Sequence, residues 1–277
     1  MARILVIGAG KMGEALIAGW IASDGAPADS IAASDITAVE PSDARRAYLV
    51  EAHGISCIAD ASEAEGADIV VLAVKPQVMP QVLQTVADNA ALNCGAEGPL
   101  FVSIAAGVAT STIEAALAAG TRVVRVMPNT PLMVGAGASG VCGGACASAA
   151  EVEHVRDLFA CMGEAVMVAE ADMDAVCAVS GSGPAYVDAL IEAMRDGGIA
   201  EGLDAALAEK LAIQTVFGTA KLLLETGMTP EDARIAVCSP GGTTLAGLDA
   251  MYAAGFTDSI VKGVKAAAAR SRELGKC

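Results

Sequence analysis

A glycine-rich turn directly after the first apolar run limits what this chain can fold into. Residues 3–20 read RILVIGAGKMGEALIAGW, a short strand pattern followed by a turn and an amphipathic helix pattern. Gly8, Gly10 and Gly13 have the spacing that permits a tight turn, a close approach of backbone to a pyrophosphate, and close packing of helix on strand. The first amides of such a helix lack partners within it and can bind phosphate oxygens. The segment therefore predicts a dinucleotide-binding βα unit.

The amino-terminal part of the chain alternates apolar runs with helical patterns. Strands are expected at 3–7, 36–39, 55–58, 69–74, 100–104 and 122–127, and helices at about 11–22, 42–53, 77–90 and 110–119. Several of these strands are continuously apolar, which is typical of parallel strands covered on both faces by crossover helices. The pattern predicts a Rossmann-type α/β domain with a parallel sheet over residues 1–169.

From about residue 170 the strand pattern stops and helical patterns continue to the end. Residues 204–226 are apolar nearly all round. A helix without a polar face must be covered on every side. We therefore expect an all-helical domain over residues 170–277 in which a partner subunit supplies the missing cover, so that the protein is a homodimer or a higher homo-oligomer.

Charge and composition restrict the partners. The chain has 33 acidic and 17 basic residues, a formal net charge of −16. This balance argues against nucleic acid or an anionic membrane as a partner and favours a small-molecule ligand. Residues 126–150 lack charged side chains, but their prolines and glycines suit short strands and turns better than a spanning helix. The apolar run at the amino terminus is too short for a signal peptide, so we expect a cytoplasmic protein.

Cysteine and histidine usage predicts neither a metal site nor a hydrolase. The eight cysteines contain no Cys-x-x-Cys pair, and no histidine is spaced to complete a zinc site. We expect reduced and mostly buried cysteines in a reducing compartment. The only histidines, His53 and His154, are expected at the surface rather than as catalytic bases, which disfavours a Ser-His-Asp hydrolase.

Further candidate cofactor residues follow the predicted strands, at the sheet edge where such folds bind ligands. Lys75 and Pro76 follow the fourth strand, where the lysine either lines the cofactor or extends from a strand end into solvent. Small residues after the next strand leave room for a nicotinamide, and Asn129 offers an amide beside it. The predicted cofactor-binding set is Gly8, Ala9, Gly10, Lys11, Met12, Gly13, Glu40, Ala73, Val74, Lys75, Pro76, Ala105, Ala106 and Asn129.

A second turn lies far from the glycine-rich loop, in CSPGGTTLAGL at 238–248. Pro240 ends one helix, and the next begins at the threonines. The amides of Gly242, Thr243 and Thr244 would form a receptor for a carboxylate, and a threonine hydroxyl could bond a neighbouring heteroatom of the ligand. A plain threonine-capped helix is the alternative. SGSGPAY at 180–186 interrupts a helical region and either lines a site or permits tight packing.

The motifs IGAGKMGEA, LAVKPQ, SIAAGV, MPNTP, SGSGPAY and SPGGTT occur here in the order and spacing of pyrroline-5-carboxylate reductases, which the chain resembles over nearly its whole length. The resemblance implies reduction of 1-pyrroline-5-carboxylate to L-proline with NAD(P)H, the last step of proline biosynthesis. It also implies a helical dimerisation domain with intertwined subunits and, in many members, a decamer built from five dimers. Finally, it implies an imino-acid site at Ser239, Gly242, Thr243 and Thr244, with Thr244 as the catalytic residue near the ring nitrogen.

One departure from the family concerns the coenzyme. Glu40 follows the second strand, where the family often has a small polar residue. A carboxylate there would bond both ribose hydroxyls of NADH and repel the 2′-phosphate of NADPH. Arg45 and Arg46 could offset that repulsion by folding back, but we expect them to face solvent. The sequence therefore predicts a preference for NADH.

Two other functions are compatible with parts of the sequence. A hydroxyacid dehydrogenase of the related two-domain type would use a lysine on the first helix after the dinucleotide domain, and SGSGPAYVDALIEAM contains none. A non-catalytic dinucleotide sensor would bind cofactor and a partner protein, but the complete substrate turn argues against it. An assay for proline formation separates the sensor from the reductase.

Overall fold

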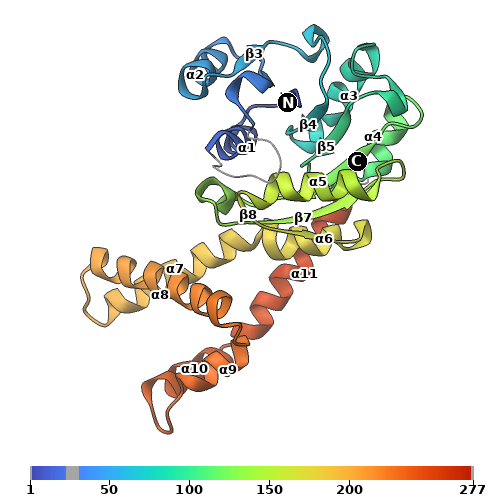
Figure 1. Ribbon diagram of the computed structural model, residues 1–277. Helices are drawn as coiled ribbons and strands as arrows, with labels where there is room; N and C mark the ends of the chain where they lie inside the picture. The colour runs from blue at the N-terminus through green and yellow to red at the C-terminus, as the bar shows by residue number, and fades with distance from the viewer. Residues whose placement is uncertain (1, 23–30, 276–277) are drawn as a thin grey trace. The chain divides into compact units, whose positions relative to one another are not determined.

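A computed structural model describes residues 2–22 and 31–275 of the chain (Figure 1). It divides into two compact units, one of residues 182–266 and one that comprises the chain before and after them. Residues 170–181 thus group with the sheet rather than with the helical region, unlike the predicted division after residue 169. In this part Met173 is fully buried, and the Ser271 hydroxyl donates to Asp174 at 2.5 Å, so the end of the last helix also belongs to the first unit.

The first unit is built on one eight-stranded sheet of order β3-β2-β1-β4-β5-β6-β7-β8. Its strands are β1 (Ile4–Ile7), β2 (Ile36–Val39), β3 (Ser56–Ile58), β4 (Ile69–Leu72), β5 (Leu100–Ser103), β6 (Val123–Met127), β7 (Gly137–Gly143) and β8 (Gly163–Met167). Strands β1 to β6 are parallel, as predicted. Strand order reverses between β1 and β4, which creates the crevice where such sheets bind ligands.

The last two strands depart from a purely parallel sheet. β7 runs antiparallel to β6, and β8 runs parallel to β7. The sequence indicated only short strands and turns here, because GASGVCG lacks the large apolar residues of a typical strand. Tight packing explains the small residues: a Cβ added at Gly140 would lie 2.8 Å from the Val176 side chain.

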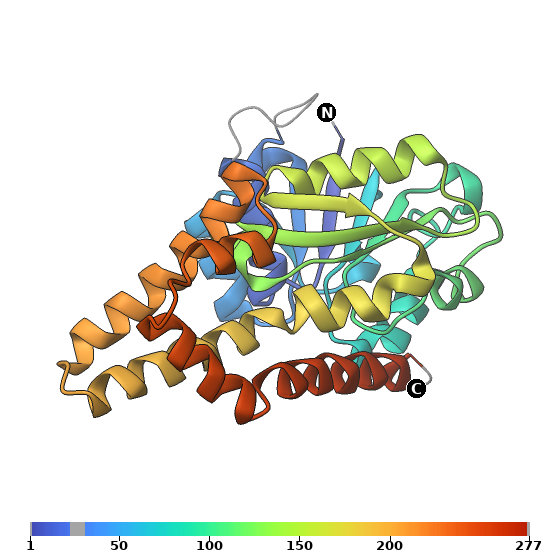
Figure 2. The same cartoon turned by 90° about the horizontal axis from the view of Figure 1, so that it is seen from below.

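Helices cover both faces of the sheet (Figure 2). On one face, α1 (Lys11–Ala22), α2 (Asp43–His53) and α5 (Ala149–Ala160) pack on β1, β2, β4, β5 and β6. Trp20 and Phe159 meet there edge to face at 6.1 Å, and the Trp20 indole donates to Leu158 O at 2.8 Å. On the other face lie α3 (Met79–Asp88) and α4 (Thr110–Ala116). The resulting two-sided core confirms the predicted Rossmann-type arrangement.

The second unit is entirely helical. α7 (Gly183–Ala200) and α8 (Ala205–Thr226) pack side by side, and α9 (Pro230–Ala236), α10 (Thr243–Ala253) and most of α11 (Phe256–Leu274) follow. Before α7, the short helix α6 (Met173–Val176) leads into a π-helical turn at Cys177–Gly181, so SGSGPAY widens the helical path instead of breaking it. Of residues 182–266, only Ala208 and Ala212 are buried. No helix in the described part of the chain is both long and apolar enough to cross a membrane.

Candidate active site

The glycine-rich turn has the geometry that its sequence predicts. Gly8 has a φ of 98°, and a Cβ there would lie 2.8 Å from the carbonyl oxygen of Ala73. A Cβ at Gly13 would lie 2.2 Å from Gly8 O, so the helix can pack on the strand only with glycine at this position. Around Gly10, by contrast, an added Cβ would meet nothing within 4 Å. Glu14 N makes the first hydrogen bond of α1, to Gly10 O at 2.9 Å. The amides of Lys11, Met12 and Gly13 therefore have no partner within the helix.

The other predicted cofactor residues reach the same edge of the sheet. Glu40 follows β2, Ala73 to Pro76 follow β4, and Ala105 and Ala106 follow β5, each at the carboxyl end of a parallel strand. Ala73 N donates to Ile7 O at 2.9 Å, which ties this loop to the strand before the glycine-rich turn. Lys75 is exposed, and both interpretations of it remain open.

Asn129 is tied to the protein more firmly than the sequence indicated. Its side-chain amide donates to Ser180 O at 3.1 Å, and its side-chain oxygen accepts from Ala138 N at 2.8 Å. The residue is only 8% exposed. It therefore joins the end of β6 to β7 and to the π-helical turn, and a cofactor contact would have to use its remaining N–H. In the same turn, a Cβ at Gly181 would lie 2.6 Å from Met127, which favours tight packing as the reason for this glycine.

The expectation that Arg45 and Arg46 face solvent is wrong. Arg45 Nε and Nη2 each donate to Ala9 O at 3.1 Å, and Nη2 also bonds Glu14 at 2.5 Å. Arg46 Nη1 donates to the carbonyls of Glu40 and Pro41 at 2.7 and 2.9 Å. The Glu40 carboxylate accepts from Ser42 N at 3.0 Å. Both guanidinium groups turn back toward nearby carbonyls and carboxylates. The partners of Arg46 are local, whereas Ala9 and Glu14 lie more than thirty positions before Arg45 in the sequence.

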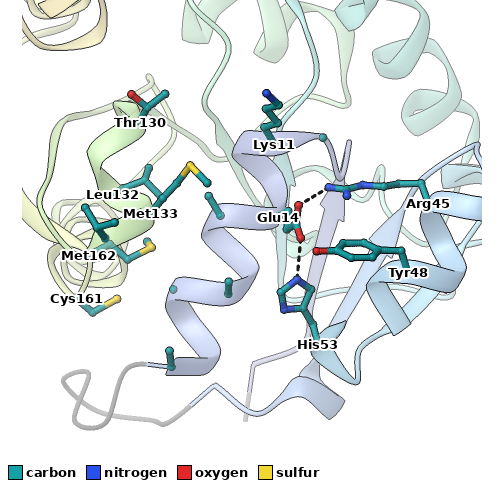
Figure 3. A pocket seen from close by; sticks show the side chains of 17 residues that line it. Lys11, Glu14, Arg45, Tyr48, His53, Thr130, Leu132, Met133, Cys161 and Met162 are labelled. Carbon is teal, nitrogen blue, oxygen red and sulfur yellow. Dashed lines mark hydrogen bonds and ion pairs between the residues drawn. The ribbon is translucent and has the colours of Figure 1, made fainter. Parts of the chain in front are cut away.

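His53 is also not the surface residue that the sequence predicted, whereas His154 is exposed as expected. The His53 side chain is 16% exposed, and its Nε2 lies 3.1 Å from Glu14 Oε1. Figure 3 shows the side chains of His53, Arg45 and Tyr48, all on α2, pointing toward Glu14. These residues line a groove along α1 with a volume of about 1220 Å³. Burial raises the pKa of Glu14, but hydrogen bonds from His53, Arg45 and Tyr48 outweigh it, so the pKa lies below its ordinary value.

The predicted substrate turn lies in the helical unit. Gly241 has a φ of 69°, and a Cβ at Gly242 would lie 2.5 Å from Ser239 Oγ, so the turn depends on both glycines. Gly242 is the N-cap of α10, and no side chain caps this helix, which removes the threonine-cap alternative. The expectation of a free Gly242 amide is wrong, because Gly242 N donates to Ser239 O at 2.9 Å. The amides of Thr243, Thr244 and Leu245 remain as the unpaired donors at the helix start.

Cysteines form no metal cluster in the described ranges. All seven cysteines there are free thiols, but only Cys142 is buried, so the expectation of mostly buried cysteines is wrong. Burial raises the pKa of the Cys142 thiol to about 11. The eighth, Cys277, lies outside the described residues. Between residues 2–22 and 31–275, no group of three or more His, Cys, Asp or Glu side chains is arranged to hold a metal ion.

Comparison with known proteins covers both units. A family profile described as "Pyrroline-5-carboxylate reductase dimerisation" matches residues 170–274, and one described as "NADP oxidoreductase coenzyme F420-dependent" matches residues 3–107. The pyrroline-5-carboxylate reductase of Synechocystis sp. is 42% identical over 98% of this chain and 97% of its own.

Two solved structures agree over the full length. A pyrroline-5-carboxylate reductase of Coxiella burnetii, 32% identical, superposes with a TM-score of 0.88 over 100% of this chain and 99% of its own. The pyrroline carboxylate reductase of Plasmodium falciparum, solved with NADP bound, is 28% identical, with a TM-score of 0.86 over 99% and 98%. With a dinucleotide-type sheet edge, a dimerisation region and this similarity over the whole chain, the protein belongs to the pyrroline-5-carboxylate reductase family.

Proposed function

We propose that the chain binds its two reactants with two different turns, the dinucleotide at the glycine-rich edge and the imino acid at residues 239–244. The protein is an oxidoreductase that reduces 1-pyrroline-5-carboxylate to L-proline with NAD(P)H. The observation that carries this activity is the similarity to named reductases over 98% of the chain.

The glycine-rich edge fits a dinucleotide. A Cβ added at Gly10 would meet nothing within 4 Å, and the amides of Gly10 and of Lys11, Met12 and Gly13 at the start of α1 are available to a ligand. Such amides, at the positive end of a helix, bind pyrophosphate oxygens. NAD(P)H, when bound, supplies the hydride that adds to the carbon of the C=N bond.

The turn at residues 239–244 suits a small carboxylate. The amides of Thr243 and Thr244 bind the imino-acid carboxylate, and the Thr244 hydroxyl orients the ring nitrogen. Ser239 and Gly242 shape this turn through their backbone bond. Thr243 and Thr244 are exposed in the single chain and open to a ligand. A cyclic imine can enter already protonated, so the chain needs only to hold and orient it rather than to supply a strong acid.

The preferred coenzyme is NADH. Glu40 stands at the end of β2, where its carboxylate binds the ribose hydroxyls and repels a 2′-phosphate. The two arginines that could have neutralised the carboxylate already have other partners: Arg45 bonds Ala9 O and Glu14, and Arg46 bonds Asp43 and the backbone carbonyls of Glu40 and Pro41. Neither guanidinium therefore stands free to receive a phosphate.

The functional assembly is a homodimer that can associate further, up to the decamer that the family resemblance implies. Support comes from the dimerisation profile and from the apolar side chains left exposed on α8. The site of the reaction is the cytoplasm, which suits the seven free thiols of the described residues.

A direct assay tests the function. The purified protein is incubated with 1-pyrroline-5-carboxylate and with NADH or NADPH, and both proline and oxidised coenzyme are quantified. We expect equal amounts of the two products and a higher kcat/KM with NADH. Coenzyme binding without proline formation would contradict the reductase and favour a dinucleotide sensor.

A further inference from the structure

A partly buried ion cluster connects α1 and α2 beside the glycine-rich turn. Glu14 lies on the first turn of α1, near the amides that would face a pyrophosphate. An unpaired carboxylate there would repel the diphosphate. Arg45 and His53 bond its two oxygens, at 2.5 and 3.1 Å (Figure 3). The pairing neutralises the carboxylate at the point where an anion has to approach.

Arg45 also forms hydrogen bonds with the glycine-rich turn. Its Nε and Nη2 both donate to Ala9 O at 3.1 Å, and Ala9 is fully buried between Gly8 and Gly10. Ala9 O and Gly10 N belong to one planar trans peptide group, in which the C=O and N–H bonds point in opposite directions. Any group that holds the carbonyl therefore sets the direction of the Gly10 N–H.

Besides Ala9 O, two groups hold the guanidinium in place, and His53 supports both of them. Glu14 bonds Nη2, and the Tyr48 ring lies under the guanidinium carbon, 5.0 Å from its centroid. Tyr48 meets His53 edge to face at 6.4 Å, and His53 bonds the second oxygen of Glu14. The fork of Arg45 thus has one fixed orientation, which a flexible lysine would not reproduce.

We propose that Arg45 is a positioning residue for coenzyme binding: it holds the Ala9–Gly10 peptide so that the Gly10 N–H faces the pyrophosphate, and Glu14 acts by holding Arg45. This role rests on the proposed coenzyme site at the glycine-rich turn. Arg45 contacts the turn from its protein side and not the 2′-position of the coenzyme, so its effect is the same for NADH and NADPH.

The test measures coenzyme binding directly, by titration of the purified full-length protein with NADH and with NADPH. We expect Arg45→Ala to raise both Kd values about tenfold, which corresponds to the loss of a hydrogen-bonding pair to a charged group. Arg45→Lys should give a smaller rise. KM for the imino acid and kcat at saturating NADH should stay within about twofold, because the substrate turn is unchanged.

Arg156→Ala is the matched control. Arg156 lies on α5 and is paired with Asp157 and Glu153, in an ion pair remote from the glycine-rich turn in sequence and contact. This variant should bind both coenzymes like the unmutated protein. An unchanged Kd in Arg45→Ala would overturn the proposal, as would an equal rise in Arg156→Ala.

A double-mutant cycle separates positioning from general destabilisation. Glu14→Gln should raise the NADH Kd less than Arg45→Ala does. The double variant should bind NADH no more weakly than Arg45→Ala alone, because both changes disrupt the same contact of Arg45 with Ala9 O. Additive effects would contradict the action of Glu14 through Arg45. If Arg45→Ala does not fold, Glu14→Gln and Arg45→Lys decide: normal NADH affinity in both overturns the proposal. Failure of the unmutated protein to bind any nicotinamide would instead refute the coenzyme site.

Discussion

The two compact units differ in how they bury apolar surface. The sheet unit has two continuous clusters of buried side chains, one on each face of the sheet. The helical unit buries only two alanines within residues 182–266 and leaves Phe217 and Leu224 of α8 at 58% and 86% exposure. A region with so little core of its own is not stable alone. The sheet unit therefore has a core of its own, whereas the helical unit leaves large apolar side chains exposed, as expected of a region that matches a dimerisation profile.

The largest expected effect is that of a charge introduced on the apolar surface of α8, which should prevent the helical unit from associating with a second copy. Phe217→Glu should shift the protein from dimer or higher oligomer to monomer, weakening association by about two orders of magnitude or more, because an ionised side chain resists burial in an apolar interface. Light scattering coupled to gel filtration measures the change. Gln214→Glu, at an exposed polar position on the same helix, is the control. An intact oligomer in Phe217→Glu would mean that α8 does not face a partner.

A truncated side chain in the core of the sheet unit should lower the stability of that unit without changing the oligomeric state. Leu16 of α1 is fully buried, and Leu16→Ala should lower the free energy of unfolding of this unit by about 2–5 kcal/mol through lost burial and a residual cavity. Denaturant unfolding monitors stability, and light scattering should show the oligomer unchanged. Dissociation at native conditions would show that the two units depend on each other more than their separate cores indicate.

Loss of the Thr244 hydroxyl should impair the use of the imino acid without changing coenzyme binding. Thr244→Ala is expected to keep the Kd for NADH and to lower kcat/KM for the imino acid about tenfold or more, since a single orienting hydrogen bond contributes on this scale. The neighbouring Thr243→Ser keeps a hydroxyl and serves as the control. Turnover of Thr244→Ala within about twofold of the unmutated protein would exclude the orienting role.

The coenzyme preference should change at one residue of the sheet unit. Glu40→Ser removes the carboxylate opposite the 2′-position, so kcat/KM with NADPH should rise relative to NADH by several-fold, on the order of 1 kcal/mol. Steady-state kinetics with both coenzymes provides the ratio. If the unmutated protein already uses NADPH as well as NADH, Glu40 does not set the choice.

The smallest expected effect concerns pH and the Glu14 cluster. Because the pKa of Glu14 is lowered in the folded protein, the carboxylate stabilises the fold above its unfolded pKa of about 4.3, and this contribution is lost as pH falls through the folded value. Glu14→Gln should therefore be less stable than the unmutated protein near neutral pH, and this difference in stability should shrink at an acidic pH below the folded pKa of Glu14. Thermal unfolding at both pH values measures it. A gap independent of pH would assign the effect to packing rather than to charge.

Much of the sheet unit was predictable because its signals are local. The helix after the glycine-rich turn was expected at 11–22 and runs over Lys11–Ala22, and the second strand was expected at 36–39 and found there. Glycine spacing, apolar runs and capping residues such as Ser42 act between neighbours in the chain. The antiparallel β7 was not predicted, because its small residues reflect packing against a segment more than thirty positions later.

The candidate site shows the same division. The sequence by itself determined the Rossmann-type sheet, the edge that collects the cofactor loops, and the turn before α10, since each depends on short-range spacing and on the direction of parallel strands. Only the tertiary structure decided that Arg45 holds Ala9, that His53 pairs with Glu14, and that Asn129 bonds Ser180 O. The physical reason is that a side chain or carbonyl takes the nearest unsatisfied partner in space, and that partner has no fixed distance along the sequence.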